Sequence, residues 1–560
     1  MQTVSKWEIL ELALYSDKRL DNPFTEVSLR ASFSHGSCCS YEADGFYDGE
    51  ENGRHVWRVR FAPMCEGEWS YKTVSNLPEL NTEGRFECGA PVSRGGLTTN
   101  PHFANWFFRE DGNAQMILNE GWYPHPANGG YLAHEDVDFQ QPSEADMRAY
   151  LKVLGEHNVN MIIDIGQLYA RQSTITDSSF RWPWKVVDAA HNKIDKERFN
   201  LDYYQRMDRF LEAAKAENIF FAMELLYDNS VVRPREWGNH PLNVNNGGWL
   251  KGNEHGTGWD VMFDLDNKVH VSYMERYVKY TVARFSAYWN LFWSVGSENG
   301  NLIRLPQERL PYALFPAEKA AAWYNYWGDF IARKDPYGRL RSFGDAGKQA
   351  LMECTAHNNV AITQDPRDYQ RGDVRYYFEA MNAFGEEFWH FGRPAVVGEM
   401  TAETNNQYGT ERRLYWIGFT AAYSMGRADR HFCPYANGGL VESQKFGIDG
   451  VPPIYDDIKR LGQFVEDRGV RFWRMRPNDD LIAPQDNALI YCLAAKDEEY
   501  VVYYVNGGTA TIADLPAVNY EWFNPRTGET ASAGKATGTT DFSAPDSEDW
   551  VLHLVAADRI

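Results

Sequence analysis

Apolar and polar residues alternate over much of the N-terminal part of the chain. Segments 27–34 (VSLRASFS), 55–63 (HVWRVRFAP) and 68–75 (EWSYKTVS) carry apolar side chains at about every second position. This period is typical of strands with one buried face. Turn sequences such as Asp-Gly and Asn-Gly separate the segments, which favours short strands joined by tight turns. We therefore predict an N-terminal β-sandwich over residues 1–93.

The pattern changes between residues 94 and 470, where short apolar runs alternate with amphipathic segments. The strand-like runs are 114–122, 159–166, 219–228, 290–299, 339–345, 359–365, 394–400 and 427–433. The helix-like segments repeat their apolar residues at three- and four-residue spacing and are 143–157, 201–217, 270–286, 316–334 and 411–426. Strands that alternate with helices indicate βαβ units and a parallel sheet. We predict an α/β fold in which eight such units close into a (β/α)8 TIM barrel. A doubly wound open sheet is the alternative, but no GxGxxG sequence follows the first run.

Strand-like alternation returns in the last part of the chain. Segments 488–496, 499–508 and 550–556 are rich in Val, Tyr and Leu and are bounded by Gly, Asn and Pro. Such composition favours β-structure. We predict a C-terminal β-sandwich over residues 471–560, so that two β-sandwich domains flank a barrel domain over residues 94–470.

Charge and composition exclude several classes of protein. The 56 Lys and Arg against 78 Asp and Glu give a formal net charge of −22, which disfavours nucleic acid as a partner. No window approaches the roughly 18 apolar residues of a membrane span. The seven cysteines include no CxxC, and no compact His/Cys cluster exists, so we predict neither a metal site nor a cofactor. The N-terminus lacks the features of a secretory signal, from which we expect a cytoplasmic protein. Nothing in the sequence indicates an oligomeric state.

Two glutamates stand where apolar runs end inside the predicted barrel. Glu298 closes the fourth run and Glu399 closes the seventh. Barrel enzymes carry their chemistry at the C-terminal ends of the strands, so both carboxylates are expected at one mouth. Cleavage of a glycosidic bond needs one carboxylic acid to protonate the leaving oxygen, and a second carboxylate to attack the sugar or activate water. An oligosaccharide or glycoside is therefore the expected substrate. The alternative for Glu298 is a carboxylate that caps the helix after the fourth strand, and the alternative for Glu399 is an acid in the first turn of the following helix.

Other polar and aromatic residues follow the predicted strands or lie in the loops beyond them. Those assigned to substrate binding are Trp122, Asp164, Glu224, Trp237, Asn299 and Gln364. For Asp164 and Glu224 a structural role, as partners in salt bridges inside the barrel, is the favoured interpretation. For the two tryptophans, loop packing and a flat platform for a sugar ring are equally open.

Three stretches of sequence resemble a known family. NPFTEV, DGFYDG and WRVRFAPMCEGEWSYKT resemble a leading β-sandwich of unknown role. FFREDGNAQMILNEGWYPH resembles the first strand of an apiosidase-like barrel, and YEWFNPRTGE with DWVLHL resembles a trailing β domain. Together they span nearly the whole chain. The layout resembles that of the retaining glycoside hydrolases of the (β/α)8-barrel clan, whose catalytic glutamates end strands four and seven.

This resemblance implies a role for each glutamate. Glu298 would be the general acid/base, and Glu399 the nucleophile that forms a covalent glycosyl-enzyme, so that the anomeric configuration is retained. The clan usually places Asn directly before the acid/base, where it holds the sugar 2-hydroxyl. Here that position is Ser297, which is assigned to substrate binding and leaves the identity of the sugar open.

The long segment 229–260 after the third predicted strand favours a walled pocket and hence exo action, on plant or algal oligosaccharides. The main alternative is a non-catalytic carbohydrate-binding protein on the same scaffold. A polysaccharide lyase and a metal-dependent barrel hydrolase are further alternatives. The lyase would need a basic residue to neutralise a uronate, which the acidic composition disfavours.

Overall fold

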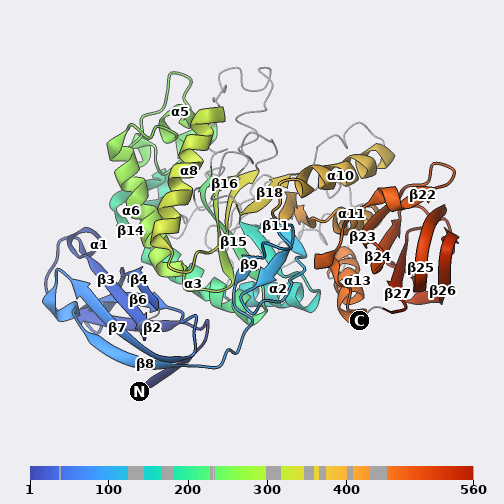
Figure 1. Ribbon diagram of the computed structural model, residues 1–560. Helices are drawn as coiled ribbons and strands as arrows, with labels where there is room; N and C mark the ends of the chain where they lie inside the picture. The colour runs from blue at the N-terminus through green and yellow to red at the C-terminus, as the bar shows by residue number, and fades with distance from the viewer. Residues whose placement is uncertain are drawn as a thin grey trace.

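The chain is seen here as a computed structural model with three parts arranged in sequence order (Figure 1). The structure describes residues 1–36, 39–123, 144–164, 168, 182–227, 231, 234–297, 317–345, 359–364, 374–399, 408–428 and 451–558. A β-sandwich comes first, a barrel with surrounding helices lies in the middle, and a β-sheet follows (Figure 1). The predicted fold class is confirmed in this form.

The N-terminal part consists of two facing sheets. One contains β1 (Gln2–Ser5), β8 (Glu83–Gly89), β7 (Gly67–Ser75), β3 (Leu29–His35) and β4 (Cys39–Asp44), and the other β2 (Leu10–Ser16), β6 (Arg54–Phe61) and β5 (Phe46–Glu51). The alternating apolar positions meet between the sheets, where the rings of Phe33 and Phe61 stack with centroids 4.1 Å apart. Trp69 fills the same core. Burial of one face of each sheet is what the two-residue period dictates.

Eight parallel strands close the central barrel. In order around it they are β11 (Asn119–Tyr123), β12 (Met161–Asp164), β15 (Phe220–Tyr227), β16 (Leu291–Ser297), β17 (Arg341–Asp345), β18 (Val360–Gln364), β19 (Ala395–Glu399) and β20 (Ser424–Ala428). Alternate positions such as Ile163, Ala222 and Ile362 share one buried cluster, whereas Ile162 and Ala361 belong to a cluster formed with the helices. Side chains therefore fill the interior of the barrel, as expected for eight strands.

Amphipathic helices surround the barrel. They are α2 (Glu144–Glu156), α3 (Leu201–Ala216), α6 (Lys268–Phe285), α8 (Ala317–Lys334), α10 (Val374–Trp389), α11 (Tyr408–Thr420) and α13 (Ile454–Asp467). The first four and α11 correspond to the five predicted helices, and α10 and α13 lie outside them. In the part of the chain that the structure describes, no helix is long and apolar enough to cross a membrane.

The eighth strand lies earlier in the chain than the sequence pattern places it. The predicted segment is 427–433, whereas β20 covers Ser424–Ala428, most of which the pattern assigns to the end of a helix. The helix α11 ends earlier, at Thr420, and Ala422 adopts a φ of 61°. This left-handed conformation stops a helix. The strand that follows then pairs with both β19 and β11.

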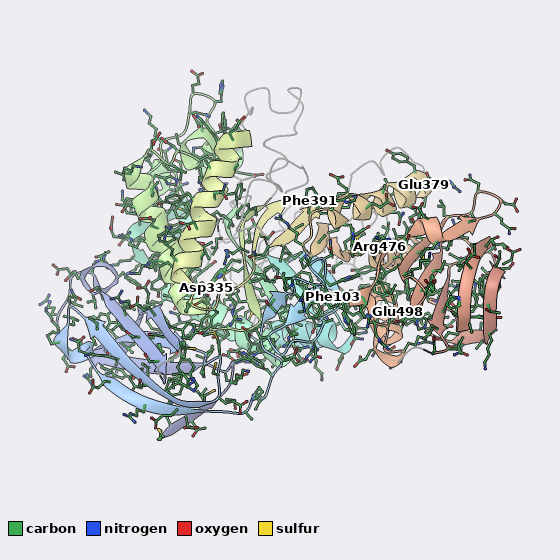
Figure 2. The ribbon with its side chains drawn as sticks, viewed as in Figure 1. Phe103, Asp335, Glu379, Phe391, Arg476 and Glu498 are labelled. Carbon is green, nitrogen blue, oxygen red and sulfur yellow. The ribbon has the colours of Figure 1, made fainter. Side chains whose placement is uncertain are left out.

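The end of the barrel at which the strands begin lies toward the N-terminal sandwich. Asp335, just beyond the last residue of α8, marks this end in Figure 2. Its carboxylate accepts a hydrogen bond of 2.9 Å from the indole of Trp293. Buried ion pairs join the two parts, because Arg284 of α6 contacts Asp208 of α3 at 2.6 Å and Asp48 of the sandwich at 2.8 Å. Arg60 of the sandwich reaches the same Asp208.

The C-terminal part is one connected sheet. Its order is β21 (Arg476–Pro477), β23 (Ile490–Ala495), β24 (Glu499–Tyr504), β27 (Trp550–Ala556), β25 (Thr509–Phe523) and β22 (Ile482–Pro484), and β26 (Thr530–Ser543) pairs with β25. One face packs on the barrel helices, where the imidazole of His553 lies 2.8 Å from Glu499 and 3.7 Å from Glu521. Its ring also meets Phe464 of α13. The predicted β-rich C-terminal part is thus present, with its strands in a single hydrogen-bonded sheet.

Candidate active site

The C-terminal edge of the barrel carries the strand ends that the sequence singles out. Strand β16 ends at Ser297, directly before Glu298, and β19 ends at Glu399. The two strands are three apart along β16–β17–β18–β19. Glu298 and Asn299 lie outside the described residues. For Trp122, Ser297, Gln364 and Glu399 the structure describes the backbone and not the side chain.

Bulges interrupt the strand pairing close to this edge. Thr363 pairs with Val397, but the next residue, Gln364, pairs with Glu399, so that Gly398 is an extra residue in β19. The register also shifts near the end of β11 and within β17. A bulge reverses the alternation of the residues beyond it and is frequent beside active sites.

Asp164 and Glu224 lie near the ends of neighbouring strands, β12 and β15, and both are almost wholly buried, with exposed fractions of 0% and 1%. Both lie close enough to Tyr277 of α6 to influence its phenol. Burial raises the pKa of Tyr277, and the charges of Asp164 and Glu224 raise it further. The structure therefore brings these two predicted residues together beside one tyrosine. Each also takes part in further interactions.

Trp237 belongs to α4 (Pro234–Asn239), in the long loop after β15, and its ring is 2% exposed. The indole stacks on His240 with ring centroids 5.3 Å apart. A Cβ atom at Gly258 would lie 2.4 Å from the same indole. These contacts are those of loop packing, one of the two roles that the sequence leaves open for Trp237.

The same loop is fixed where it meets α6. The indole of Trp249 donates to Nδ1 of His270 at 2.9 Å, and Nε2 of His270 donates to the carbonyl of Met262 at 2.8 Å. Burial lowers the pKa of His270 to about 4. The ring is therefore neutral near neutral pH, with its proton on Nε2, which both hydrogen bonds require. The loop that the sequence predicts as a pocket wall is thus a packed structure with polar anchors.

Two residues near the site, Asn119 and Tyr277, are not among those that the sequence pattern singles out. Asn119 of β11 donates to the carbonyl of Val397 at 3.1 Å and accepts from the Ser424 hydroxyl at 2.7 Å. It thereby ties the first strand of the barrel to β19 and β20, two residues before Glu399. Tyr277, the neighbour of the buried acids, donates to the carbonyl of Leu225 at 3.1 Å. An Asn within the apolar run MILNEGW is the signal that marks the first; the helical pattern around Tyr277 offers none.

Among the residues that the structure describes, no group of three or more His, Cys, Asp or Glu side chains is arranged to hold a metal ion. The polar side chains described in and around the barrel therefore carry carboxylate, amide and phenol groups.

Two family models match the flanking parts of the chain. Residues 3–76 match a model described as "Domain of unknown function (DUF5060)". Residues 477–555 match one described as "Putative collagen-binding domain of a collagenase". No curated protein matches the chain in sequence.

Several solved structures resemble the whole molecule or most of it. One, a "putative glycoside hydrolase" from Bacteroides vulgatus, has a TM-score of 0.68 at 16% identity, over 99% of this chain and 100% of the other. A "glycoside hydrolase family 5" protein from Bacteroides vulgatus has a TM-score of 0.57 at 13% identity, over 83% of this chain and 95% of the other. A third, described as "Glycoside hydrolase", has a TM-score of 0.56 at 14% identity, over 84% and 99% of the two chains. At these identities the likeness establishes the fold: this chain shares its architecture with structures that are named glycoside hydrolases.

Proposed function

We propose that the protein is a glycoside hydrolase in which Glu298 is the general acid/base and Glu399 is the nucleophile. The observation that carries the proposal is that β16 and β19, the strands at whose ends the sequence places the two glutamates, belong to one closed barrel. Strand β16 leads directly into Glu298, and β19 ends at Glu399. The ends of these two strands belong to the edge at which barrel enzymes carry out their chemistry.

Two features of the described strands support the proposal. Along β16, Phe292 belongs to the buried cluster inside the barrel. In β19 the bulge makes Gly398 an extra residue directly before Glu399, and such bulges are frequent beside active sites. The proposal requires that the two glutamates face one glycosidic bond, so that one attacks while the other protonates.

The proposed mechanism proceeds with retention in two steps. Glu399 attacks the anomeric carbon while Glu298 gives its proton to the leaving oxygen, and a covalent glycosyl-enzyme results. Glu298 then removes a proton from water, which releases the sugar and restores both groups. Retention requires carboxyl groups about 5–5.5 Å apart, against about 6.5–9.5 Å for inversion. Ser297, next to the acid/base, is proposed to contact the sugar 2-hydroxyl, with Trp122, Asn299 and Gln364 as further substrate contacts.

We propose exo action on plant or algal oligosaccharides. The packed loop after β15, held by Trp249 and His270, supports this because a fixed wall limits a site to the end of a sugar chain. Buried Asp164 and Glu224 are assigned an indirect role, as groups inside the barrel wall that support the site.

Two single substitutions and a matched control test the proposal. Glu298→Gln and Glu399→Gln keep the shape of the side chain and remove its charge, whereas Glu403→Gln makes the same change four residues beyond the proposed nucleophile. Hydrolysis is measured on a panel of aryl glycosides and oligosaccharides. We expect the first two variants to lose about 10²–10⁴-fold in kcat, with folding intact by circular dichroism. The control is expected to stay near the parent rate.

If either Glu298→Gln or Glu399→Gln keeps the parent rate, the corresponding role is refuted. If the parent binds oligosaccharides but hydrolyses none of them, the protein is a carbohydrate-binding protein on a barrel scaffold instead.

A further inference from the structure

A pocket of about 490 Å³ lies beside the barrel mouth, between the loop after β15 and the first turns of α8. Ligand pockets typically measure about 300–1,000 Å³. Its walls come from α5 (Trp259–Met262) with the residues after it, and from α8; the lining residues are Trp259, Asp260, Phe263, Asp264, Leu265, Asp266, Lys319 and Ala322. All of them are in the described part of the chain.

The position of this pocket follows from the direction of α8. Lys319 lies near the start of the helix, and Asp335, which marks the other end of the barrel, lies just beyond its last residue. Eighteen helical residues span about 27 Å. The pocket is therefore at the end of α8 remote from the N-terminal sandwich, where Figure 1 shows α5. Both walls follow the C-terminal ends of strands, β15 and β16, so the pocket is on the side of the proposed active site.

One wall of the pocket is aromatic and fixed. Trp259 is half-buried, and Phe263 packs on the buried Trp323 of α8 with ring centroids 4.6 Å apart. The turn before α5 is held by Asn253, whose side-chain oxygen accepts from the backbone and the hydroxyl of Thr257 at 3.0 and 2.9 Å. A preformed aromatic surface binds a flat apolar face at little cost in conformational entropy.

The charged groups of the pocket are exposed, and Asp260 uses one carboxylate oxygen to accept from the side-chain amide of Asn253 at 3.2 Å. Asp260, Asp264, Asp266 and Lys319 are exposed, and within the described ranges no ion pair involves any of them. Asp264 uses one carboxylate oxygen to accept from the backbone of Asp266 at 2.9 Å. Three carboxylates and one ammonium group supply many acceptors and a few donors, with a net formal charge of −2. This surface accepts hydroxyl hydrogens and repels uronates and sulfated sugars.

We propose that this pocket is a second carbohydrate site, which binds one neutral sugar unit of an oligosaccharide beside the mouth of the barrel. The indole of Trp259 faces the C–H side of the ring, and the three aspartates accept from its hydroxyl groups. The proposal requires that the protein meets oligosaccharides, but not that Glu298 and Glu399 act catalytically.

The test measures binding in a chain that cannot turn over its ligand. The double variant Glu298→Gln/Glu399→Gln is mixed with cellotetraose, mannotetraose, xylotetraose or galactotetraose, and backbone hydrogen exchange is followed by mass spectrometry. We expect at least one tetrasaccharide to protect peptides over residues 258–267 and 317–323. Oligogalacturonate and spermidine serve as charged comparison ligands.

Three further substitutions in that background assign the protection to the pocket. Ala322→Trp fills the pocket from an exposed helical position without removing a contact, and Ala383→Trp makes the same change on an exposed position of α10. Trp259→Ala removes the aromatic wall. We expect Ala322→Trp to abolish the protection, Ala383→Trp to leave it intact, and Trp259→Ala to weaken the affinity about ten-fold or more.

The proposal is overturned if no tetrasaccharide protects these two segments, or if the protection survives Ala322→Trp. It is also overturned if spermidine alone protects them, because the pocket is then a cation site. Hydrolysis does not enter this measurement, so the result is independent of whether the parent protein proves to be a glycosidase.

Discussion

Asn119 and Gly426 are in close contact, and we predict that Asn119→Ala partly offsets the loss of stability caused by Gly426→Ala. These residues pair where β11 meets β20 and the barrel closes. A Cβ atom at Gly426 would lie 1.8 Å from Nδ2 and 2.7 Å from Cγ of Asn119, and 2.9 Å from the carbonyl oxygen of Val397. Asn119 cannot move aside without losing its hydrogen bonds to Val397 and Ser424. Gly426→Ala therefore overpacks a site that has no room to relax, at a cost of about 1–3 kcal/mol or more.

Asn119→Ala acts in the opposite sense. It removes the crowded amide and leaves the Val397 carbonyl without this donor in the barrel interior, which costs about 1–3 kcal/mol. In the double variant the two closest clashes disappear and only the 2.9 Å contact with the Val397 oxygen remains. The two costs should not add, and a favourable coupling of about 0.5–3 kcal/mol is expected.

Thermal unfolding of the four chains, followed by calorimetry, measures this coupling. The double variant should melt above Gly426→Ala and close to Asn119→Ala. Gly238→Ala is the matched control, because a Cβ atom there meets nothing within 4 Å, and it should leave the midpoint unchanged or raise it slightly. A double variant that melts below both single variants, by the sum of their shifts, would refute the packing argument.

Two further predictions concern the contacts between the three parts. Asp208→Ala leaves the buried guanidinium groups of Arg60 and Arg284 without this carboxylate, and should cost about 3–5 kcal/mol in denaturant unfolding; the same change at exposed Glu144 should cost under about 1 kcal/mol. The second concerns His553, between the C-terminal sheet and α13. Burial opposes its charge, but the hydrogen bond to Glu499 and the nearby carboxylate of Glu521 outweigh burial and raise its pKa above the ordinary value. A raised folded-state pKa means that this stabilisation is fully present below about pH 6.5 and is lost as the pH rises through the folded-state pKa. Melting temperatures from pH 5 to 9 should therefore fall more steeply for the parent than for His553→Gln, and parallel curves would contradict the assignment.

The local pattern of apolar residues is sufficient to predict most strands of the barrel, because each parallel strand is a short apolar run flanked by helices. The fourth and seventh runs, 290–299 and 394–400, end within two residues of the last described residues of β16 and β19. The eighth strand was misplaced for a non-local reason. Its central residue, Gly426, is required by the side chain of Asn119 across the barrel seam, and no periodicity within residues 424–428 reports that contact.

Contacts between distant segments set the remaining features. Trp237 is covered by glycines 15 and 21 positions further along its own loop, Gly252 and Gly258, so that sequence spacing alone left its role open. The bulge at Gly398 depends on pairing with β18, and the glycine itself is the only sign of the bulge in the sequence of β19. Arg60, Asp208 and Arg284 come from two parts of the fold, and their ion pairs follow from tertiary packing alone.

Trapping of the glycosyl-enzyme tests the central proposal most directly. The parent protein is incubated with activated 2-deoxy-2-fluoro glycosides of each sugar that it hydrolyses, and the modified peptide is identified by mass spectrometry. The account predicts one covalent sugar per chain, attached to Glu399, and slower trapping in Glu298→Gln. A sugar attached to any other residue, or hydrolysis that releases the inverted anomer without a trapped intermediate, would contradict it.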